Sequence, residues 1–172
     1  LSEHKKNIQG TSRSLESKKL IYLNFKKSID LESLFENKNF SFVINCVGAL
    51  RESSNEKLKL LNIIFPKALL ALSSKYNFKI IHISTDAVFS SIAGEMYEQS
   101  IPNPNDLYGK SKLKGELSKN TINIRTSILG FDPIEHKGLL EFILRNKSKK
   151  IFGFTDNKWS GSTTLQLAKF IK

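Results

Sequence analysis

The sequence predicts an α/β protein with a doubly wound parallel sheet and part of a small C-terminal lobe. Short runs of β-branched and apolar residues alternate with longer helical stretches over most of the chain, as in successive βαβ units. The runs over residues 40–46 and 78–84 are almost continuously apolar, which is typical of parallel strands that are covered on both faces. These two observations favour a parallel sheet over an antiparallel one.

The first half of the chain alternates short strands with two helices. The expected elements are strands over residues 8–11, 19–24 and 40–46, a helix over 30–36 with Asp30 as its N-cap, and a long helix over 55–76. Pro66 lies inside the long helix. We expect it to kink the helix, because proline lacks the backbone N–H that an interior helical position donates.

The second half continues this pattern and then loosens. The strand over residues 78–84 is followed by a loop over 90–104 rich in Ser, Gly, Asn and Pro, a polar helix over 106–119 and a strand over 121–127. Past Gly130 the expected elements are a helix over 137–146, a strand-like run over 150–154 and a helix over 163–172. We therefore divide the chain into residues 1–130, which carry the sheet, and 131–172, which form part of a second lobe.

Composition argues against several classes of protein. The 172 residues include one cysteine, Cys46, and three scattered histidines, so neither an intrachain disulfide nor a zinc site of the usual spacing is expected. No apolar run approaches the roughly 20 residues that span a bilayer, and the polar first residues do not resemble a signal peptide. We therefore expect a cytoplasmic protein with no membrane or metal partner.

The chain is strongly basic, with a net charge of +11 from 27 basic and 16 acidic residues. Nucleic-acid binding is one explanation, and it predicts an association that weakens steeply with salt. However, only four of the basic residues are arginines, the side chain that base-reading and phosphate-clamping surfaces favour, and the lysines are spread along the chain. A solvated basic surface with no nucleic-acid partner is the better interpretation.

The two ends of the sequence lack parts that this fold normally has. A doubly wound nucleotide-binding fold begins with a strand, a glycine-rich turn and a helix. Residues 1–6 have the pattern of the end of such a helix, and the last residues stop within a helical pattern. We expect a fragment that lacks both ends. The alternative is a genuinely short domain, which would leave its first crossover helix unanchored.

Chemically useful side chains follow the predicted buried strands. Tyr108 and Lys112 are four residues apart on a predicted helix, so they project from one face. Thr85 ends the preceding strand, at the edge where ligands bind in this class of fold. Gly48 ends the strand before that and would let the backbone approach a ligand. Asn62 lies inside an apolar helix, where an unpaired amide is costly.

In this order, the motifs resemble the extended short-chain dehydrogenase/reductase superfamily, and within it the dTDP-4-dehydrorhamnose reductase family. The matching segments are residues 43–49 (VINCVGA), Asn62-x-x-x-Pro66, 81–89 (IHISTDAVF), 102–116 with the Y-G-K-S-K motif, 124–127 (IRTS) and 159–165 (WSGSTTL). The resemblance implies a Rossmann-like NAD(P)-binding domain over residues 1–130, without its first strand and glycine-rich turn. Residues 131–172 then correspond to a partial substrate-binding lobe.

The resemblance also implies the chemistry of a reduction site. In such a site a reduced nicotinamide delivers hydride to a ketone, and Tyr108 protonates the developing alkoxide. Lys112 lowers the pKa of the phenol and holds the nicotinamide ribose, and Thr85 hydrogen-bonds the substrate oxygen. Asn62 bonds to helix backbone and supports a proton-relay water. The implied function is NADPH-dependent reduction of a nucleotide-activated 4-keto sugar for surface-polysaccharide synthesis.

The implied cofactor contacts come from three places in the chain. They are Ser12 and Arg13 after the first strand, Asn24 after the second, and Cys46, Val47 and Gly48 after the third, together with Asn62, Tyr108 and Lys112. A relative that prefers NAD would carry an acidic residue near position 13 to bind the ribose 2′-hydroxyl. Arg13 with the Ser12 hydroxyl suits a 2′-phosphate instead, so we expect NADPH to be favoured over NADH.

Departures from the family pattern leave other functions open. Dehydratases of the superfamily carry Asp-Glu after the threonine, whereas this chain has Asp86-Ala87, so ketone reduction is favoured over dehydration. Epimerisation stays open, because it can use the same tyrosine, and so does a non-catalytic, NADP-binding regulatory subunit. Ser90-Ser91 replaces an Asp-Gly pair that is frequent in relatives, which alters the substrate-side loop. The sequence does not specify the sugar, and a homodimer is compatible with it.

Overall fold

The computed structural model describes residues 8–12, 20–23, 31–90, 94–132, 136, 138–156 and 159–172. The chain forms two compact units: Leu31–Ser127 is one, and Leu1–Asp30 together with Ile128–Lys172 is the other. The predicted division at residue 130 is between a cofactor-binding part and a substrate-binding part, not between compact units. It stays a prediction.

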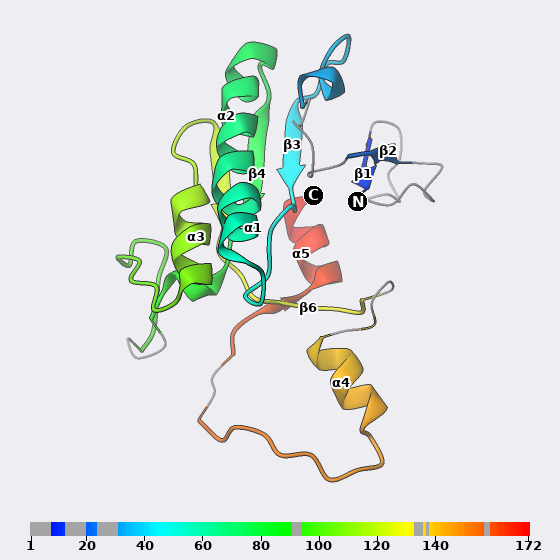
Figure 1. Cartoon of the computed structure of the whole chain (residues 1–172), viewed down its shortest axis with the longest axis vertical. Coiled ribbons are helices and arrows are strands. Elements are labelled where there is room, and N and C mark those ends of the chain that lie inside the picture. The colour runs from blue at the N-terminus through cyan, green and yellow to red at the C-terminus, as the bar shows by residue number, and fades with distance from the viewer. Residues whose placement is uncertain are drawn as a thin grey trace. The chain divides into compact units, whose positions relative to one another are not determined.

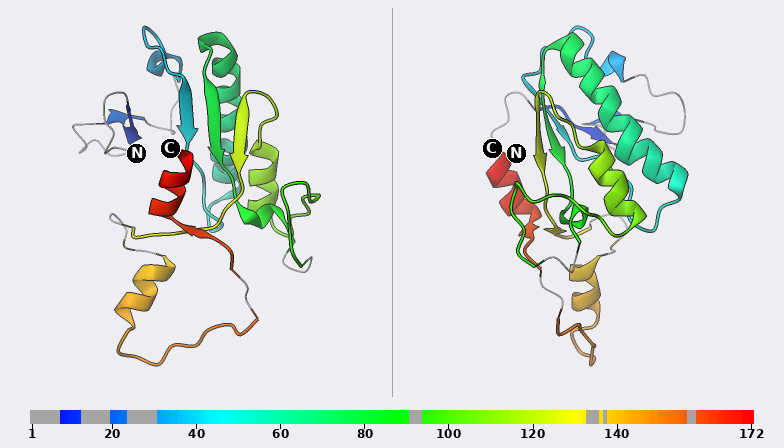
Figure 2. Two further views of the ribbon diagram at one scale, coloured as in Figure 1. Left: turned by 180° about the vertical axis from the view of Figure 1, so that it is seen from behind. Right: turned by 90° about the vertical axis from the view of Figure 1, so that its left-hand side faces the viewer.

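The unit Leu31–Ser127 is built on a three-stranded parallel sheet. Its strands are β3 (Phe42–Asn45), β4 (Lys79–Ile83) and β5 (Thr121–Ile124), hydrogen-bonded in the order β3-β4-β5. Helices α1 (Asn55–Lys59), α2 (Phe65–Tyr76) and α3 (Leu107–Gly115) lie together against one face of this sheet (Figures 1 and 2). The parallel α/β architecture predicted from the alternating pattern is therefore confirmed.

The core of this unit follows from the apolar runs of the sequence. Ile80 and Ile81 of β4 are buried, as are Leu58, Leu61 and Leu69 of the long helical segment. Around the far end of that helix, Phe35 stacks on Phe78 with ring centroids 4.7 Å apart and also contacts Phe40 and Tyr76. Each buried aromatic or aliphatic side chain of this size stabilises the folded state by about 1.5–3 kcal/mol relative to exposure.

The predicted long helix is present but contains a widened turn. It consists of α1 (Asn55–Lys59), a π-helical segment η3 (Leu60–Ile64) and α2 (Phe65–Tyr76). The Ser54 hydroxyl caps its start by accepting from the Lys57 N–H, and Asn77 ends it in the left-handed conformation. The chain stays helical through Pro66. The irregularity that proline demands is taken up by the π segment before it, because Pro66 has no N–H to donate to the Asn62 carbonyl.

Side-chain hydrogen bonds mark both ends of helix α3 (Leu107–Gly115), from Asp106 at the start and from Glu116 just after the end. Asp106 is its N-cap, and its Oδ1 accepts from the Gly109 N–H at 2.7 Å. The sequence predicted a helix to residue 119, and this end is wrong. Glu116 leaves the helix in an extended conformation because its carboxylate binds Ser84 and Arg125.

Shorter elements differ more from the prediction. A 3-10 turn, η2 (Glu32–Leu34), replaces the helix expected over residues 30–36, and η4 (Asp86–Val88) is a further 3-10 turn, capped by Thr85. Residues 150–154 form no strand. The proposed N-cap Asp30 lies outside the described residues.

The described residues of the other unit form two small parallel strand pairs and two helices. Strand β1 (Thr11–Ser12) pairs with β2 (Ile21–Tyr22), and β6 (Ile128–Leu129) pairs with β7 (Ser162–Thr163). Helix α4 is Leu139–Arg145, and α5 is Thr164–Ile171, which begins with a capping box between Thr163 and Gln166. The pairing of β6 with β7 was not predicted, because two-residue strands carry no periodic signal.

Membrane-spanning helices and metal-binding clusters are both absent from the described residues. Within them, no helix combines the length and apolar character that crossing a bilayer requires. The same part of the chain holds no group of three or more His, Cys, Asp or Glu side chains that could bind a metal ion.

Close packing of α3 on the π segment makes Gly115 a sensitive position. A Cβ at Gly115 would lie 1.8 Å from the Asn62 carbonyl oxygen, a backbone atom that cannot move away. We expect Gly115→Ala to lower the free energy of unfolding by about 2 kcal/mol or more, although alanine is the better helix former. Gly153→Ala, where the new Cβ meets nothing within 4 Å, is the matched control and should change it little. Urea denaturation of both variants measures the difference, and equal stabilities would contradict the packing.

Candidate functional site

The carboxyl ends of β3, β4 and β5 carry the polar residues predicted from the sequence. The loop over residues 46–49 follows β3, Ser84 and Thr85 follow β4, and α3 brings Tyr108 and Lys112. Contacts between these segments are direct, as described below. The structure therefore brings together the predicted catalytic residues Thr85, Tyr108 and Lys112 within the unit Leu31–Ser127.

Tyr108 is half-buried and lies between carboxylates and one guanidinium. Burial raises the pKa of its phenol, a hydrogen bond to Thr85 lowers it, Asp86 and Asp106 raise it, and Arg51 lowers it. The net pKa is above its ordinary value. The phenol is therefore protonated at neutral pH, which is the form that can donate a proton.

Thr85 is 6 % exposed and already makes two local hydrogen bonds. Its Oγ1 accepts from the Ala87 N–H at 3.2 Å, and it donates to Asp86 Oδ1 at 3.2 Å. These bonds hold Thr85 as the cap of η4. Thr85 is thus the cap of η4, and its contact with a substrate oxygen stays a prediction.

Lys112 is 5 % exposed, which is unusual for a lysine. Its Nζ donates to the Ile83 carbonyl oxygen at 2.7 Å. Burial lowers the pKa of the ammonium to about 8, while Glu116 and Cys46 act in the opposite direction. Desolvation also raises the pKa of the Cys46 thiol, and Lys112 offsets part of that. Lys112 thus lies at the end of β4, next to the loop that follows β3.

Asn62 joins three segments of the site through its side-chain amide. Its Oδ1 accepts from the Ala49 N–H at 2.8 Å, and its Nδ2 donates to the Ala49 carbonyl at 3.3 Å and to Ser111 Oγ at 2.9 Å. The side chain is fully buried. The prediction that Asn62 bonds to helix backbone is wrong, because its backbone partner is Ala49 in the loop after β3. Its predicted cofactor and water roles stay predictions.

A buried pair of polar side chains shapes the start of the same loop. Asn45 and His82 are register partners on β3 and β4, and Asn45 Nδ2 lies 2.9 Å from His82 Nδ1. Asn45 Oδ1 accepts from the Val47 N–H at 3.0 Å. His82 Nδ1 is then the acceptor, so its proton is on Nε2, which has no hydrogen-bond partner among the described residues. The sequence placed His82 within the expected strand over residues 78–84, but it did not indicate the partner Asn45.

Glu116 and Arg125 form an ion pair that sequence reasoning missed. Arg125 donates from Nε and Nη2 to the two carboxylate oxygens of Glu116, at 2.9 and 2.7 Å, and Ser84 donates to Glu116 Oε1 at 2.7 Å. Burial raises the pKa of Glu116, but the bonds from Arg125 and Ser84 outweigh it, and the net pKa is lowered. The pair anchors the end of α3 to β5. Both residues lay in segments that carried the family resemblance, which was the available signal.

A second missed residue is Arg51, in the turn after the loop over residues 46–49. Its Nη2 lies 3.1 Å from Asp106 Oδ2, and its guanidinium carbon lies 5.8 Å from the centroid of the Tyr108 ring. No spacing rule connects position 51 with position 108, so the contact could not be predicted from the sequence.

Three predicted cofactor residues are not placed relative to these. Arg13 and Asn24 lie outside the described residues. Ser12 is in β1, which belongs to the other compact unit. The 2′-phosphate contact therefore stays a prediction.

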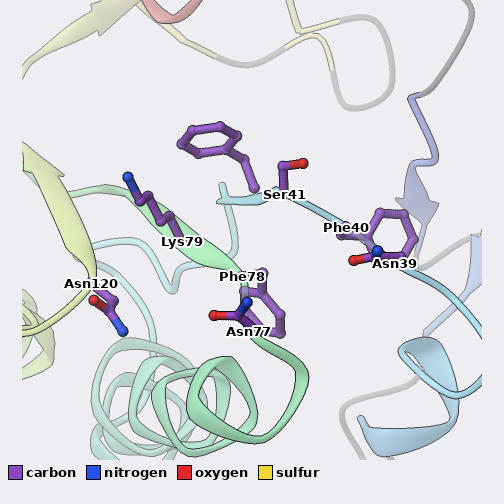
Figure 3. A pocket seen from close by; sticks show the side chains of 8 residues that line it. Asn39, Phe40, Ser41, Asn77, Phe78, Lys79 and Asn120 are labelled. Atoms are coloured by element: carbon purple, nitrogen blue, oxygen red, sulfur yellow. The ribbon is translucent and has the colours of Figure 1, made fainter.

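A hollow of about 430 Å³ lies at the opposite edge of the sheet (Figure 3). It is lined by residues at the amino ends of the strands, among them Phe42, Lys79 and Asn120. None of the predicted catalytic or cofactor residues lines it. It is separate from the candidate site.

Comparison with known proteins gives one family and several similar chains. A family model described as the RmlD substrate binding domain matches residues 1–159. A hypothetical dTDP-4-dehydrorhamnose reductase from Sulfolobus tokodaii has a similar structure, with a TM-score of 0.85 and 27% identity, covering 98% of this chain and 63% of that one. A dTDP-4-dehydrorhamnose reductase from Bacillus anthracis, solved with NADP, has a TM-score of 0.71 at 23% identity, covering 81% of this chain and 54% of that one. At that identity the likeness shows the fold.

A curated relative carries a different name. The chain is 30% identical over 118 residues to methionine adenosyltransferase 2 subunit beta from Xenopus tropicalis, covering 66% of this chain and 35% of that protein. The chain thus spans about a third of the length of this relative.

Burial of neutral His82 predicts a specific loss of stability in acid. Its pKa is lowered to about 4 by burial and by Lys112, against an ordinary value of 6.5. Because the unfolded chain takes up this proton first, stability should fall as the pH drops from about 6.5 to about 4, by about 3 kcal/mol from this group.

Urea denaturation between pH 7 and pH 4.5 measures this loss. His82→Gln keeps an acceptor for Asn45 but cannot titrate, so its stability should depend less on pH over that window. His136→Gln, which removes an exposed histidine, is the control and should keep the wild-type dependence. A wild-type dependence in His82→Gln would show that His82 does not carry the effect.

Proposed function

Because the chain belongs to the RmlD substrate binding domain family, we propose that it carries the reduction site of an enzyme that reduces a nucleotide-activated 4-keto sugar with NADPH. The fold is that of the extended short-chain dehydrogenase/reductases, with dTDP-4-dehydrorhamnose reductases among its structural neighbours. The observation that carries the proposal is the grouping of Tyr108, Thr85 and Lys112 at one edge of the sheet. Such an activity would supply a nucleotide-linked sugar for the synthesis of surface polysaccharide.

Each of the three residues has a distinct task in this proposal. Tyr108 donates a proton to the substrate oxygen, which its raised pKa allows at neutral pH. Thr85 turns its hydroxyl from Asp86 to the same oxygen and so orients the ketone. Lys112 keeps one donor on the Ile83 carbonyl and has two further donors for hydroxyl groups of a bound ribose.

The residues beside Lys112 fit a nicotinamide nucleotide. A Cβ at Gly48 would lie 3.6 Å from Lys112 Nζ, so the missing side chain leaves open the space in front of the ammonium. Gly48 is exposed, which makes that space accessible. A bound reduced nicotinamide supplies the hydride. Cys46, Val47 and Gly48 line its path on the β3 side, and Ser12 and Arg13 would favour the 2′-phosphate of NADPH.

A second candidate function is a non-catalytic subunit that binds NADP. The similarity to methionine adenosyltransferase 2 subunit beta favours it, because that protein is named as a subunit of an enzyme. The two candidates differ in one measurement. Tight NADP binding by the full-length protein, with no oxidation of NADPH in the presence of any nucleotide-linked keto sugar, would support the subunit. Oxidation of NADPH with reduction of the keto sugar would support the reductase. Epimerisation of the sugar without net NADPH oxidation would identify an epimerase instead.

The role of Tyr108 is tested by removing its hydroxyl. In the full-length protein, Tyr108→Phe should lower kcat for keto-sugar reduction by about 100-fold or more, because the substrate oxygen loses its proton donor. NADPH affinity, measured by fluorescence titration, should change little. Tyr97→Phe, which alters an exposed tyrosine, is the matched control. Wild-type turnover in Tyr108→Phe would refute the assignment.

The cofactor path is tested at Gly48. A Cβ there makes ordinary contacts, 3.4 Å from Asn62 Oδ1 and 3.6 Å from Lys112 Nζ, so Gly48→Ala should change the free energy of unfolding by no more than about 0.5 kcal/mol. The methyl group would nevertheless occupy the space proposed for the nucleotide. We expect NADPH to bind about tenfold more weakly or worse. Unchanged affinity in a folded variant would place the cofactor elsewhere.

A further inference from the structure

Arg51, a cation to which the resemblance gives no role, lies close to the Tyr108 ring. The resemblance assigns the pKa of Tyr108 to Lys112. In the structure, however, Lys112 Nζ is bonded to the Ile83 carbonyl, and the cation that acts on the phenol is Arg51. Arg51 comes from the turn after the loop over residues 46–49, and its guanidinium lies over the Tyr108 ring at 5.8 Å.

Arg51 is held in this position by a residue with a second task. Asp106 binds Arg51 through Oδ2 and caps α3 through Oδ1, which accepts from the Gly109 N–H. Gly109 packs closely against the backbone of Ala87, since a Cβ there would lie 2.2 Å from the Ala87 carbonyl oxygen. The cap therefore holds Asp106 two residues before Tyr108, where it binds Arg51.

We propose that Arg51 is a positioning residue of this site, which together with Asp106 sets the charge state of the Tyr108 phenol. The titratable and charged groups that face Tyr108 are Asp86 after β4, Asp106 at the start of α3 and Arg51 from the β3 side. Two carboxylates favour the neutral phenol, and Arg51 opposes them. Arg51 neutralises Asp106 directly, so the effect of its removal includes the uncovered charge of Asp106.

Arginine suits this position better than lysine would. A planar guanidinium can lie over an aromatic ring and bind a carboxylate at the same time, whereas an ammonium is more strongly hydrated. The side chain of Arg51 is 63% exposed, so the contact contributes little to stability and its loss should leave the fold intact.

The test is a titration of the tyrosines by NMR in protein labelled with ¹³C at the ring Cζ, with the Tyr108 signal assigned from Tyr108→Phe. In Arg51→Gln, the ionisation midpoint of Tyr108 should rise by about 0.5 to 1 pH unit. Arg51→Lys keeps a positive charge, so the Tyr108 midpoint should rise less in this variant than in Arg51→Gln. Asp106→Asn, which keeps a capping side chain, should move the midpoint down, and the double variant should lie near the wild type. Lys110→Gln removes an exposed positive charge from the same helix. It should shift the Tyr108 midpoint by no more than about a third of the shift in Arg51→Gln.

Two results would overturn the proposal. One is an unchanged Tyr108 midpoint in Arg51→Gln. The other is a shift shared equally by Tyr76 and Tyr97, which would mean a general effect of net charge.

The catalytic consequence rests on the proposed function, whereas the titration does not. If Tyr108 must hold its proton to act, Arg51→Gln should move the alkaline limb of kcat/KM upward by the same shift. A Tyr108 shift in a protein that reduces no keto sugar would reject the proposed function and leave the role of Arg51 intact. Turnover with no shift in either profile would do the reverse.

Discussion

The side-chain amide of Asn62 is the interaction on which the arrangement of the site depends. It pairs with both backbone groups of Ala49, and its remaining donor reaches Ser111, whose hydroxyl donates to the Tyr108 carbonyl. One buried side chain thus ties the loop after β3 to the helix that carries Tyr108. Leaving such a group unpaired would cost about 1–3 kcal/mol per buried donor or acceptor, so the three segments are held in one geometry. The π turn at Leu60–Ile64 and Pro66 complete the arrangement, because Gly115 packs on the Asn62 carbonyl that the proline cannot bond.

The sequence was sufficient for elements whose signal is long and periodic. The strands β3 and β4 and the long helix over Asn55–Tyr76 follow directly from apolar runs and helical spacing. Prediction failed where a contact distant in sequence decides the outcome. Helix α3 ends at Gly115, where Glu116 turns to bind Arg125, and the sequence near residue 116 does not indicate this contact. The π-helical segment could not be predicted from the sequence either, because one extra residue per turn barely changes the apolar pattern over five residues.

The candidate site divides in the same way. Tyr108 and Lys112 were found because four-residue spacing on a helix is a local rule, and Thr85 because a parallel strand ends there. The partners that set their electrostatics were not found. Arg51, Asp106 and Glu116 act across elements, and their contacts exist only after the sheet has brought the strand ends together. The grouping of these residues could therefore be predicted, whereas the contacts that shift their pKa values could not.

Those pKa directions bear on which reaction the site favours. Reduction needs a phenol that holds its proton until the alkoxide forms, whereas removal of hydride from an alcohol, the first step of many epimerisations, needs a phenolate that accepts one. Burial together with Asp86 and Asp106 keeps Tyr108 in the protonated form, and Lys112 is occupied with the Ile83 carbonyl instead of stabilising a phenolate. Arg51 is then the group that keeps the phenol from becoming too weak an acid to give its proton up. The charges around Tyr108 thus favour donation over abstraction, which agrees with the proposed reduction of a ketone.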